Sequence, residues 1–162
     1  MSKTFNVLLV CTGNTCRSPM AAGILKKMLV DEKVSGISVY SAGTAAMEGM
    51  PATELAAKTT AEWGMDISEH RSQPVTDALV EQADLILTMT PEHREEVLLH
   101  DVGAAGKIFL LKSFPEPVKP GPAYSVRDPI GGGASDYQRS FLEIEESLRR
   151  IFSSIVQRAG KR

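Results

Sequence analysis

Short hydrophobic runs alternate along the chain with segments whose hydrophobic residues repeat at helical spacing. The runs at 5–10, 37–40, 84–89 and 107–111 are almost continuously apolar, which is typical of strands buried on both faces of a parallel sheet. Strand–helix alternation of this kind predicts an α/β fold. We expect one domain over residues 1–162, a three-layer sandwich in which helices cover both faces of a four-stranded parallel sheet.

Several local signals mark the expected helices. The pair Ser18–Pro19 predicts a helix start, with the serine as N-cap and the proline at the first helical position. A second helix is expected over 53–63, and a third starts with the same capping logic at Thr90–Pro91. Segment 112–133 is rich in proline and glycine, which predicts a long loop. A C-terminal amphipathic helix is marked by Phe141, Ile144, Leu148, Ile151, Phe152 and Ile155.

The charge balance narrows the possible functions. Lys and Arg number 18 against 20 Asp and Glu, a net charge of −2, and 43% of the residues are hydrophobic. This composition excludes intrinsic disorder as the main state and disfavours nucleic acid as a partner. The apolar runs are far shorter than the ~20 residues of a membrane span. With no signal-peptide pattern at the start, we expect a cytoplasmic protein without a membrane partner.

The chain has only two cysteines, Cys11 and Cys16, too few and too close for a secreted disulfide framework. In a reducing compartment they indicate a catalytic, metal-binding or redox role. A zinc site would need two further ligands, but His70, His93 and His100 are scattered and there is no second cysteine pair. We therefore expect neither a metal nor another cofactor.

The segment from Cys11 to Ser18 has the features of an anion-binding loop. Five residues between Cys11 and Arg17 can surround one tetrahedral anion, with Gly13 allowing close backbone approach and Asn14 tolerating a left-handed φ. The following helix directs its positive end to the same point, and Arg17 offers a fork of donors for phosphate oxygens. This field is expected to lower the pKa of Cys11. The predicted phosphate-binding residues are Thr12, Gly13, Asn14, Thr15, Cys16 and Ser18.

The motif Cys-x5-Arg-Ser after the first strand closely resembles the low-molecular-weight protein tyrosine phosphatase superfamily. The resemblance extends over nearly the whole chain and includes Ser41–Gly43, Ala83–Met89 and Arg127–Pro129. It implies a phosphatase whose cysteine is phosphorylated during the reaction. The expected partners are phosphorylated proteins, with phosphate or another oxyanion held in the loop.

A proton donor is needed on the opposite side of the phosphate from the nucleophile. Asp128 lies in the long loop beyond the fourth strand, where the carboxyl ends of the strands meet, and Pro129 stiffens its backbone. The resemblance assigns the general acid to this Asp-Pro pair. Asp136 is the competing carboxylate, but it fits better in the first turn of a helix. The predicted catalytic residues are thus Cys11, Arg17 and Asp128.

The resemblance also implies supporting roles near the loop. Asn14 is expected to hold the loop geometry through polar partners, and Ser18 to hydrogen-bond the thiolate. Ser41 and His70 are expected to support the loop from other segments. For His70 a surface or capping histidine is an equally good interpretation.

Two positions bear on the substrate. Tyrosine phosphatases of this type usually carry an aliphatic residue where Thr15 stands and an aromatic pair after the Asp-Pro, whereas Ile130 and Gly131 follow it here. The loop, the segment 72–76 and the Asp-Pro-x-Gly-Gly motif look most like the bacterial protein arginine phosphatase branch. A hydroxyl at Thr15 suits a guanidinium or the hydrolytic water. We therefore favour phosphoarginine, with Thr15 and Ile130 as selectivity residues and phosphotyrosine as the alternative.

Other classes and a redox role remain open at this point. A disulfide between Cys11 and Cys16 would switch the enzyme off reversibly, the alternative being that Cys16 is a small buried filler. A thioredoxin-coupled arsenate reductase needs a third cysteine, which this chain lacks. A phosphocarrier domain must preserve its phosphocysteine, which Arg17 and Asp128 argue against. A non-catalytic phosphate-binding module would not need the intact trio of Cys11, Arg17 and Asp128.

Overall fold

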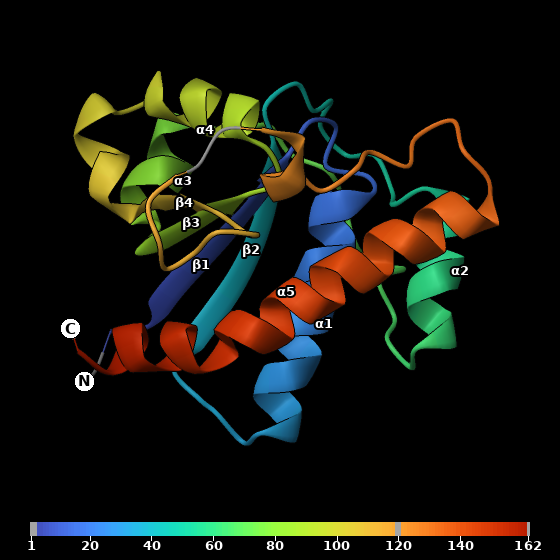
Figure 1. Ribbon diagram of the computed structural model, residues 1–162, viewed down its shortest axis with the longest axis horizontal. Helices are drawn as coiled ribbons and strands as arrows, with labels where there is room; N and C mark the ends of the chain where they lie inside the picture. The colour runs from blue at the N-terminus through green and yellow to red at the C-terminus, as the bar shows by residue number, and fades with distance from the viewer. Residues whose placement is uncertain (1–2, 119–120, 162) are drawn as a thin grey trace.

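The computed structural model, which describes residues 3–118 and 121–161, contains one four-stranded parallel sheet (Figure 1). The strands lie in the order β2-β1-β3-β4, so the first strand is central. Their bounds are β1 Phe5–Cys11, β2 Ile37–Gly43, β3 Leu85–Thr88 and β4 Ile108–Leu110. The sequence prediction of four strands in a parallel sheet is therefore confirmed.

Successive residues of the central strand face opposite sides of the sheet, as the period of a strand requires. Val7 and Leu9 belong to the core on one side, whereas Leu8 and Val10 belong to the core on the other side. All four are at most 2% exposed. The continuous apolar run at the start of the chain thus fills two cores at once.

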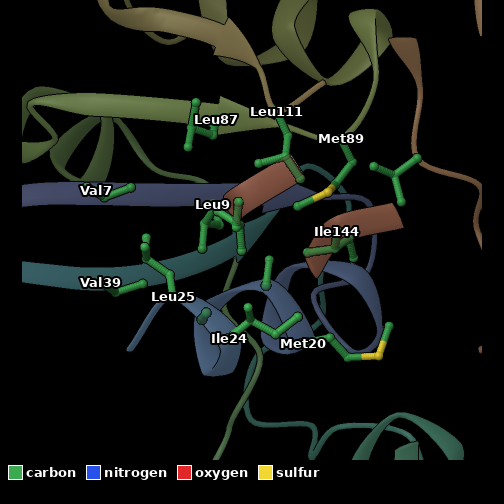
Figure 2. Packing of buried hydrophobic residues seen from close by; sticks show 14 of the residues in the cluster. Val7, Leu9, Met20, Ile24, Leu25, Val39, Leu87, Met89, Leu111 and Ile144 are labelled. Carbon is green, nitrogen blue, oxygen red and sulfur yellow. The ribbon is translucent and has the colours of Figure 1, made fainter. Parts of the chain in front are cut away.

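Helices cover both faces of the sheet, which confirms the three layers. On one face lie α1 (Arg17–Asp31), α2 (Glu54–Glu62) and α5 (Ala134–Gly160). Figure 2 shows Ile24, Leu25 and Ile144 of this layer packed against strand residues. On the other face lie α3 (Asp77–Gln82), α4 (Pro91–Leu98) and the 3-10 helix η1 (Val102–Lys107). None of the helices in the described ranges is long and apolar enough to cross a membrane.

Two of the predicted helix starts are right. The side chain of Thr53 accepts a hydrogen bond from the amide of Ala56, and that of Thr90 accepts one from the amide of His93. The prediction for Asp136 is also right, because its carboxylate accepts the amide of Gly133 at 2.9 Å in the first turn of α5. The cap at Thr90 and the place of Asp136 are predicted correctly because each depends on residues at most three positions away.

The predicted start of α1 is wrong. The helix begins at Arg17, its N-cap position is Cys16, and no side chain caps it. Ser18 and Pro19 are the second and third helical residues. The hydroxyl of Ser18 lies 2.9 Å from the sulfur of Cys11 instead of capping the helix. A contact to the preceding strand has therefore displaced the local capping pattern.

The long loop and two short helices complete the chain. The sequence analysis missed α3 and η1, which have six residues each and are too short to display a helical period. In the described part of segment 112–133, a 3-10 turn (Pro122–Tyr124) interrupts the predicted loop. This loop carries residues 126–130 to the carboxyl edge of the sheet, where the amide of Val126 donates to the carbonyl of Met89 just after β3.

Candidate active site

A cavity of about 180 Å³ lies at the carboxyl end of β1. The residues that line it come from the loop after β1 and from the long loop after β4. They are Cys11, Thr12, Gly13, Thr15, Cys16, Arg17, Asp128 and Ile130. The structure thus brings together the predicted nucleophile, arginine, acid and selectivity residues, although more than a hundred positions separate the two loops.

Several carbonyl groups of the loop are bonded to segments outside it. Those of Cys11 and Thr12 accept hydrogen bonds from the amides of residues 44–45, at 2.9 Å each. The carbonyl of Thr15 accepts the amide of Thr53, also at 2.9 Å. Carbonyls held in this way leave the loop N–H groups available to an anion in the cavity, as in other anion-binding nests.

Asn14 connects the loop to neighbouring segments through hydrogen bonds. It is fully buried and has a left-handed φ of 58°, as expected from the sequence. Its side-chain amide donates to the hydroxyls of Ser18 at 2.7 Å and Ser41 at 3.0 Å, and its side-chain oxygen accepts the amide of Gln73 at 2.9 Å. Its carbonyl accepts Nε2–H of His70 at 2.6 Å. Every polar atom of this side chain is thus used to fix the loop.

Four of the predicted site residues do not line the cavity: Asn14, Ser18, Ser41 and His70. The side chains of Asn14 and Ser18 are fully buried and do not belong to the cavity lining. Ser41 and His70 line a different hollow, of about 290 Å³, which does not include the cysteine. Half-burial lowers the pKa of His70. These residues act on the cavity through Asn14 and through the sulfur contact of Ser18.

The thiol of Cys11 is almost fully buried and lies 2.9 Å from the hydroxyl of Ser18. Because the amide of Asn14 can only donate, Ser18 accepts that bond and keeps its own hydrogen for the sulfur. Burial is the largest influence on the thiol and raises its pKa, while hydrogen bonds from Ser18, the charge of Arg17 and the amide of Asn14 lower it. The expected lowering of this pKa is therefore not confirmed, because desolvation outweighs the stabilising groups.

Arg17 is buried and held from two sides. Its Nη1 donates to the carbonyl of Val126 at 3.0 Å, and its Nη2 donates to the hydroxyl of Thr12 at 3.2 Å. Nη2 also lies 3.4 Å from Oδ2 of Asp128, whose side chain is 42% exposed. The other oxygen of Asp128 accepts the amide of Ile130 at 3.1 Å, which fixes the carboxylate at the mouth of the cavity.

The glycine that the loop needs most is outside the loop. A Cβ on Gly13 would meet only the hydroxyl of Thr15, at an ordinary 3.6 Å, so packing within the chain does not demand a glycine there. A Cβ on Gly43, at the end of β2, would lie 2.3 Å from the carbonyl of Thr12 and 2.9 Å from the amide of Asn14. Close backbone approach is therefore required at Gly43, which the sequence analysis noted only as part of a matching segment.

Two further residues at the site were missed. The hydroxyl of Tyr137 lies 3.3 Å from the sulfur of Cys16 and accepts a hydrogen bond from Thr53 at 3.2 Å. Burial raises the pKa of Tyr137 to about 12. Nε2 of His93 lies 2.7 Å from the hydroxyl of Thr12. For His93 a signal exists in the sequence, since it follows the third strand and parallel strands end at one edge of the sheet.

The residues that line the cavity suit an oxyanion placed beside a thiol. In the described ranges, no group of three or more His, Cys, Asp or Glu side chains has the arrangement of a metal site. The cavity instead combines a thiol, a guanidinium and a carboxyl group, which are the groups needed for nucleophilic displacement at phosphorus with proton transfer to the leaving group. The fold and the site together are those of a phosphatase of the α/β class.

Comparison with known sequences gives the family. Residues 6–161 match the family described as low molecular weight phosphotyrosine protein phosphatase. The chain belongs to this family of protein phosphatases. This result confirms the resemblance drawn from the Cys-x5-Arg-Ser motif.

The relatives include enzymes named for two substrates. The chain is 37% identical over 90% of its length to a probable low molecular weight protein-tyrosine-phosphatase, EpsP, of Ralstonia nicotianae, of which 87% is covered. It is 36% identical over 90% of its length to a protein-arginine-phosphatase of Bacillus subtilis, of which 93% is covered. The structure matches a mutant of the arginine phosphatase YwlE with a phosphorylated active-site serine, with a TM-score of 0.84, 33% identity, and 94% and 96% of the two chains covered.

Proposed function

We propose that this protein hydrolyses phosphorylated side chains of proteins through a phosphocysteine intermediate. Cys11 is the nucleophile, Arg17 holds the phosphoryl oxygens and Asp128 is the general acid. The observation that supports this most directly is that all three line one cavity whose loop carbonyls are bonded elsewhere. The phosphorylated active-site serine of the YwlE mutant supports a covalent phosphoenzyme in this family.

The proposed reaction has two displacements at phosphorus. In the first, the thiolate of Cys11 attacks in line, a P–S bond forms and the bond to the leaving atom breaks, while the acid form of Asp128 gives its proton to that atom. In the second, water attacks phosphorus, Asp128 takes a proton from the water, and the P–S bond breaks to release phosphate and the thiolate. Arg17 and the loop amides stabilise the equatorial oxygens in both steps.

We further propose phosphoarginine as the substrate. None of the eight residues that line the cavity is aromatic, so a phosphotyrosine ring would lack a stacking partner there. Thr15 contributes a hydroxyl to the lining and Ile130 a half-exposed aliphatic side chain. Both suit a planar, polar guanidinium better than a ring that must be held by stacking.

Phosphotyrosine is the second candidate, because the relative EpsP is named a tyrosine phosphatase and its identity is almost the same as that of the arginine phosphatase. Overall sequence identity therefore does not distinguish between the two substrates, and the choice rests on the residues that line the cavity.

Turnover of matched peptides tests both levels of the proposal. Two peptides of identical sequence, one with phosphoarginine and one with phosphotyrosine, are compared by kcat/KM. We expect hydrolysis of both to disappear in Cys11→Ser, and the phosphoarginine peptide to be preferred by the wild-type protein. Preference for phosphotyrosine would reject the arginine assignment but leave the phosphatase. Undiminished turnover by Cys11→Ser would reject the mechanism.

We also propose that a disulfide between Cys11 and Cys16 protects and silences the enzyme. Peroxide oxidises the Cys11 thiolate to a sulfenic acid, and the thiol of Cys16 then displaces water to form the S–S bond. Both cysteines are buried, and we propose that the protein acts in the cytoplasm. Mass spectrometry after mild peroxide treatment tests this. A lasting sulfonic acid on Cys11 without a disulfide would reject the switch.

A further inference from the structure

The hydroxyl of Thr12 lies between the arginine of the loop and a histidine of another helix. Nη2 of Arg17 is 3.2 Å from the Thr12 oxygen, and Nε2 of His93 is 2.7 Å from the same oxygen. Arg17 begins α1, Thr12 follows β1, and His93 lies in the first turn of α4. Three segments of the chain therefore meet at one oxygen atom.

The chemistry of the groups fixes the direction of the bond from Arg17, and the hydroxyl hydrogen of Thr12 remains for the contact with His93. A guanidinium can only donate, so Thr12 accepts from Arg17. The single hydroxyl hydrogen of Thr12 is then free to point to His93, whose Nε2 accepts it. A neutral imidazole that accepts at Nε2 carries its hydrogen on Nδ1. In this arrangement His93 is neutral and carries its hydrogen on Nδ1.

The surroundings of His93 agree with this state. The residue is 5% exposed, and Nδ1 is buried without a hydrogen-bond partner among the described residues. Burial, together with the charge of Arg17 and against the charge of Asp128, lowers the pKa of His93 to about 4. A protonated Nε2 would no longer accept the hydroxyl of Thr12, and would place a second positive charge beside Arg17.

The unpaired Nδ1 also argues for a specific role. A buried polar atom without a partner is destabilising, and an apolar side chain of similar size would fill the space without that penalty. What the imidazole provides and an apolar side chain does not is an acceptor for the hydroxyl of Thr12. The contact to Thr12 is therefore the physical reason to have a histidine here.

We propose that His93, neutral and protonated on Nδ1, is a positioning residue that orients Arg17 by accepting the hydroxyl of Thr12. Thr12 is thereby turned so that its oxygen receives Nη2, while Val126 holds Nη1 on the other side. The guanidinium is fixed before the substrate arrives. The inference rests on the proposed role of Arg17 in holding the phosphoryl group.

Two substitutions of similar polarity separate positioning from packing. The amide oxygen of His93→Gln reaches about as far as Nε2 and can accept the hydroxyl, whereas the shorter His93→Asn cannot reach it. We expect His93→Asn to lower kcat/KM and the affinity for inorganic phosphate by about tenfold, as for a lost hydrogen bond, and His93→Gln to restore both to within about twofold of wild type. Equal losses in the two variants would overturn the proposal.

Further variants test the path through Thr12. Thr12→Val removes the hydroxyl and is expected to match His93→Asn, and the double variant should lose no more than either single variant. His100→Asn is the matched control, since its ring bonds Asp77 at 2.8 Å on the surface and should leave both quantities unchanged. Additive losses in the double variant would show that His93 does not act through Thr12.

The tautomer is directly observable. In the ¹⁵N NMR spectrum, we expect the His93 ring to be neutral with its hydrogen on Nδ1 between pH 6 and 8. A ring protonated on Nε2, or an imidazolium in that range, would overturn the proposal. A role limited to packing would not select either nitrogen.

The outcomes for His93 and for the proposed function are separable. If the wild-type protein hydrolyses neither phosphopeptide, the proposed function fails. Phosphate affinity measured by calorimetry in the Cys11→Ser background still decides for His93, because it requires no turnover. A folding defect would reduce the binding stoichiometry and leave the dissociation constant of the folded fraction unchanged, which would count against positioning.

Discussion

The hydrogen bond from Ser18 to Cys11 makes the sharpest test of how the loop prepares its nucleophile. The hydroxyl lies 2.9 Å from the sulfur in a buried setting, and it is the largest of the influences that lower the pKa of the thiol. Burial acts in the opposite direction and is larger. Ser18→Ala removes the lowering group and leaves the burial, so the pKa of Cys11 is expected to rise further.

The magnitude follows from the charge on the acceptor. A hydrogen bond to an ionised group contributes about 1.5–3 kcal/mol, which corresponds to roughly a 10- to 100-fold smaller thiolate population at a fixed pH. The same factor should appear in the rate at which iodoacetamide alkylates Cys11, because the thiolate is the reactive form. Peptide mapping by mass spectrometry distinguishes Cys11 from Cys16. We expect the alkylation profile of the variant to move to higher pH.

Two controls isolate the contact. Ser41→Ala removes another partner of Asn14 without touching the sulfur, and is expected to shift the profile less. Ser147→Ala removes a hydroxyl that bonds the carbonyl of Glu143 in α5, and should not shift it. If Ser18→Ala left the profile in place or moved it to lower pH, the reasoning about this hydrogen bond would be refuted.

Three other predictions follow from the site. Gly43→Ala should destabilise the protein by about 1–3 kcal/mol and impair turnover, because its Cβ would lie 2.3 Å from the carbonyl of Thr12; Gly106→Ala, where a Cβ meets nothing within 4 Å, is the control in thermal denaturation. Thr15→Ile should raise turnover of phosphotyrosine relative to phosphoarginine, and an unchanged ratio would contradict the selectivity role. The pKa of His93 falls from 6.5 to about 4 on folding, so the unfolded chain binds more protons between these values and stability should rise with pH across that window, by at most about 3 kcal/mol. Urea denaturation of wild type and His93→Gln measures this, and an identical slope in the two proteins would contradict it.

Local patterns predicted the fold well wherever the deciding partners are close in sequence. The run from Val7 to Val10 indicates a strand buried on both faces, and the cap at Thr90 is correct for the same reason. Ser18 shows the limit. It satisfies the local rule for an N-cap, but the sulfur of Cys11 competes for its hydroxyl, and that competition is visible only in three dimensions.

The site divides in the same way. Cys11 and Arg17 can be predicted from the sequence because a single loop contains them. Asp128 can be predicted because the strand topology brings its loop to the same edge of the sheet. Tyr137 and the packing role of Gly43 depend on contacts between distant segments that no motif records, whereas the position of His93 after the third strand is a signal that was overlooked. The pKa of Cys11 was misjudged on the same ground, since charges and donors can be read from the sequence but the extent of burial cannot.

The way in which the loop is held also indicates where substrate selectivity must arise. Loop carbonyls are bonded to other segments, Asn14 uses every polar atom of its side chain, and Arg17 is fixed through both terminal nitrogens. The loop is organised before binding, and the phosphoryl group is alike in all phosphorylated side chains. The loop therefore has little means of distinguishing one phosphorylated side chain from another. We therefore propose that the side chains lining the cavity discriminate between a guanidinium and an aromatic ring, with Thr15 and Ile130 as the selectivity residues.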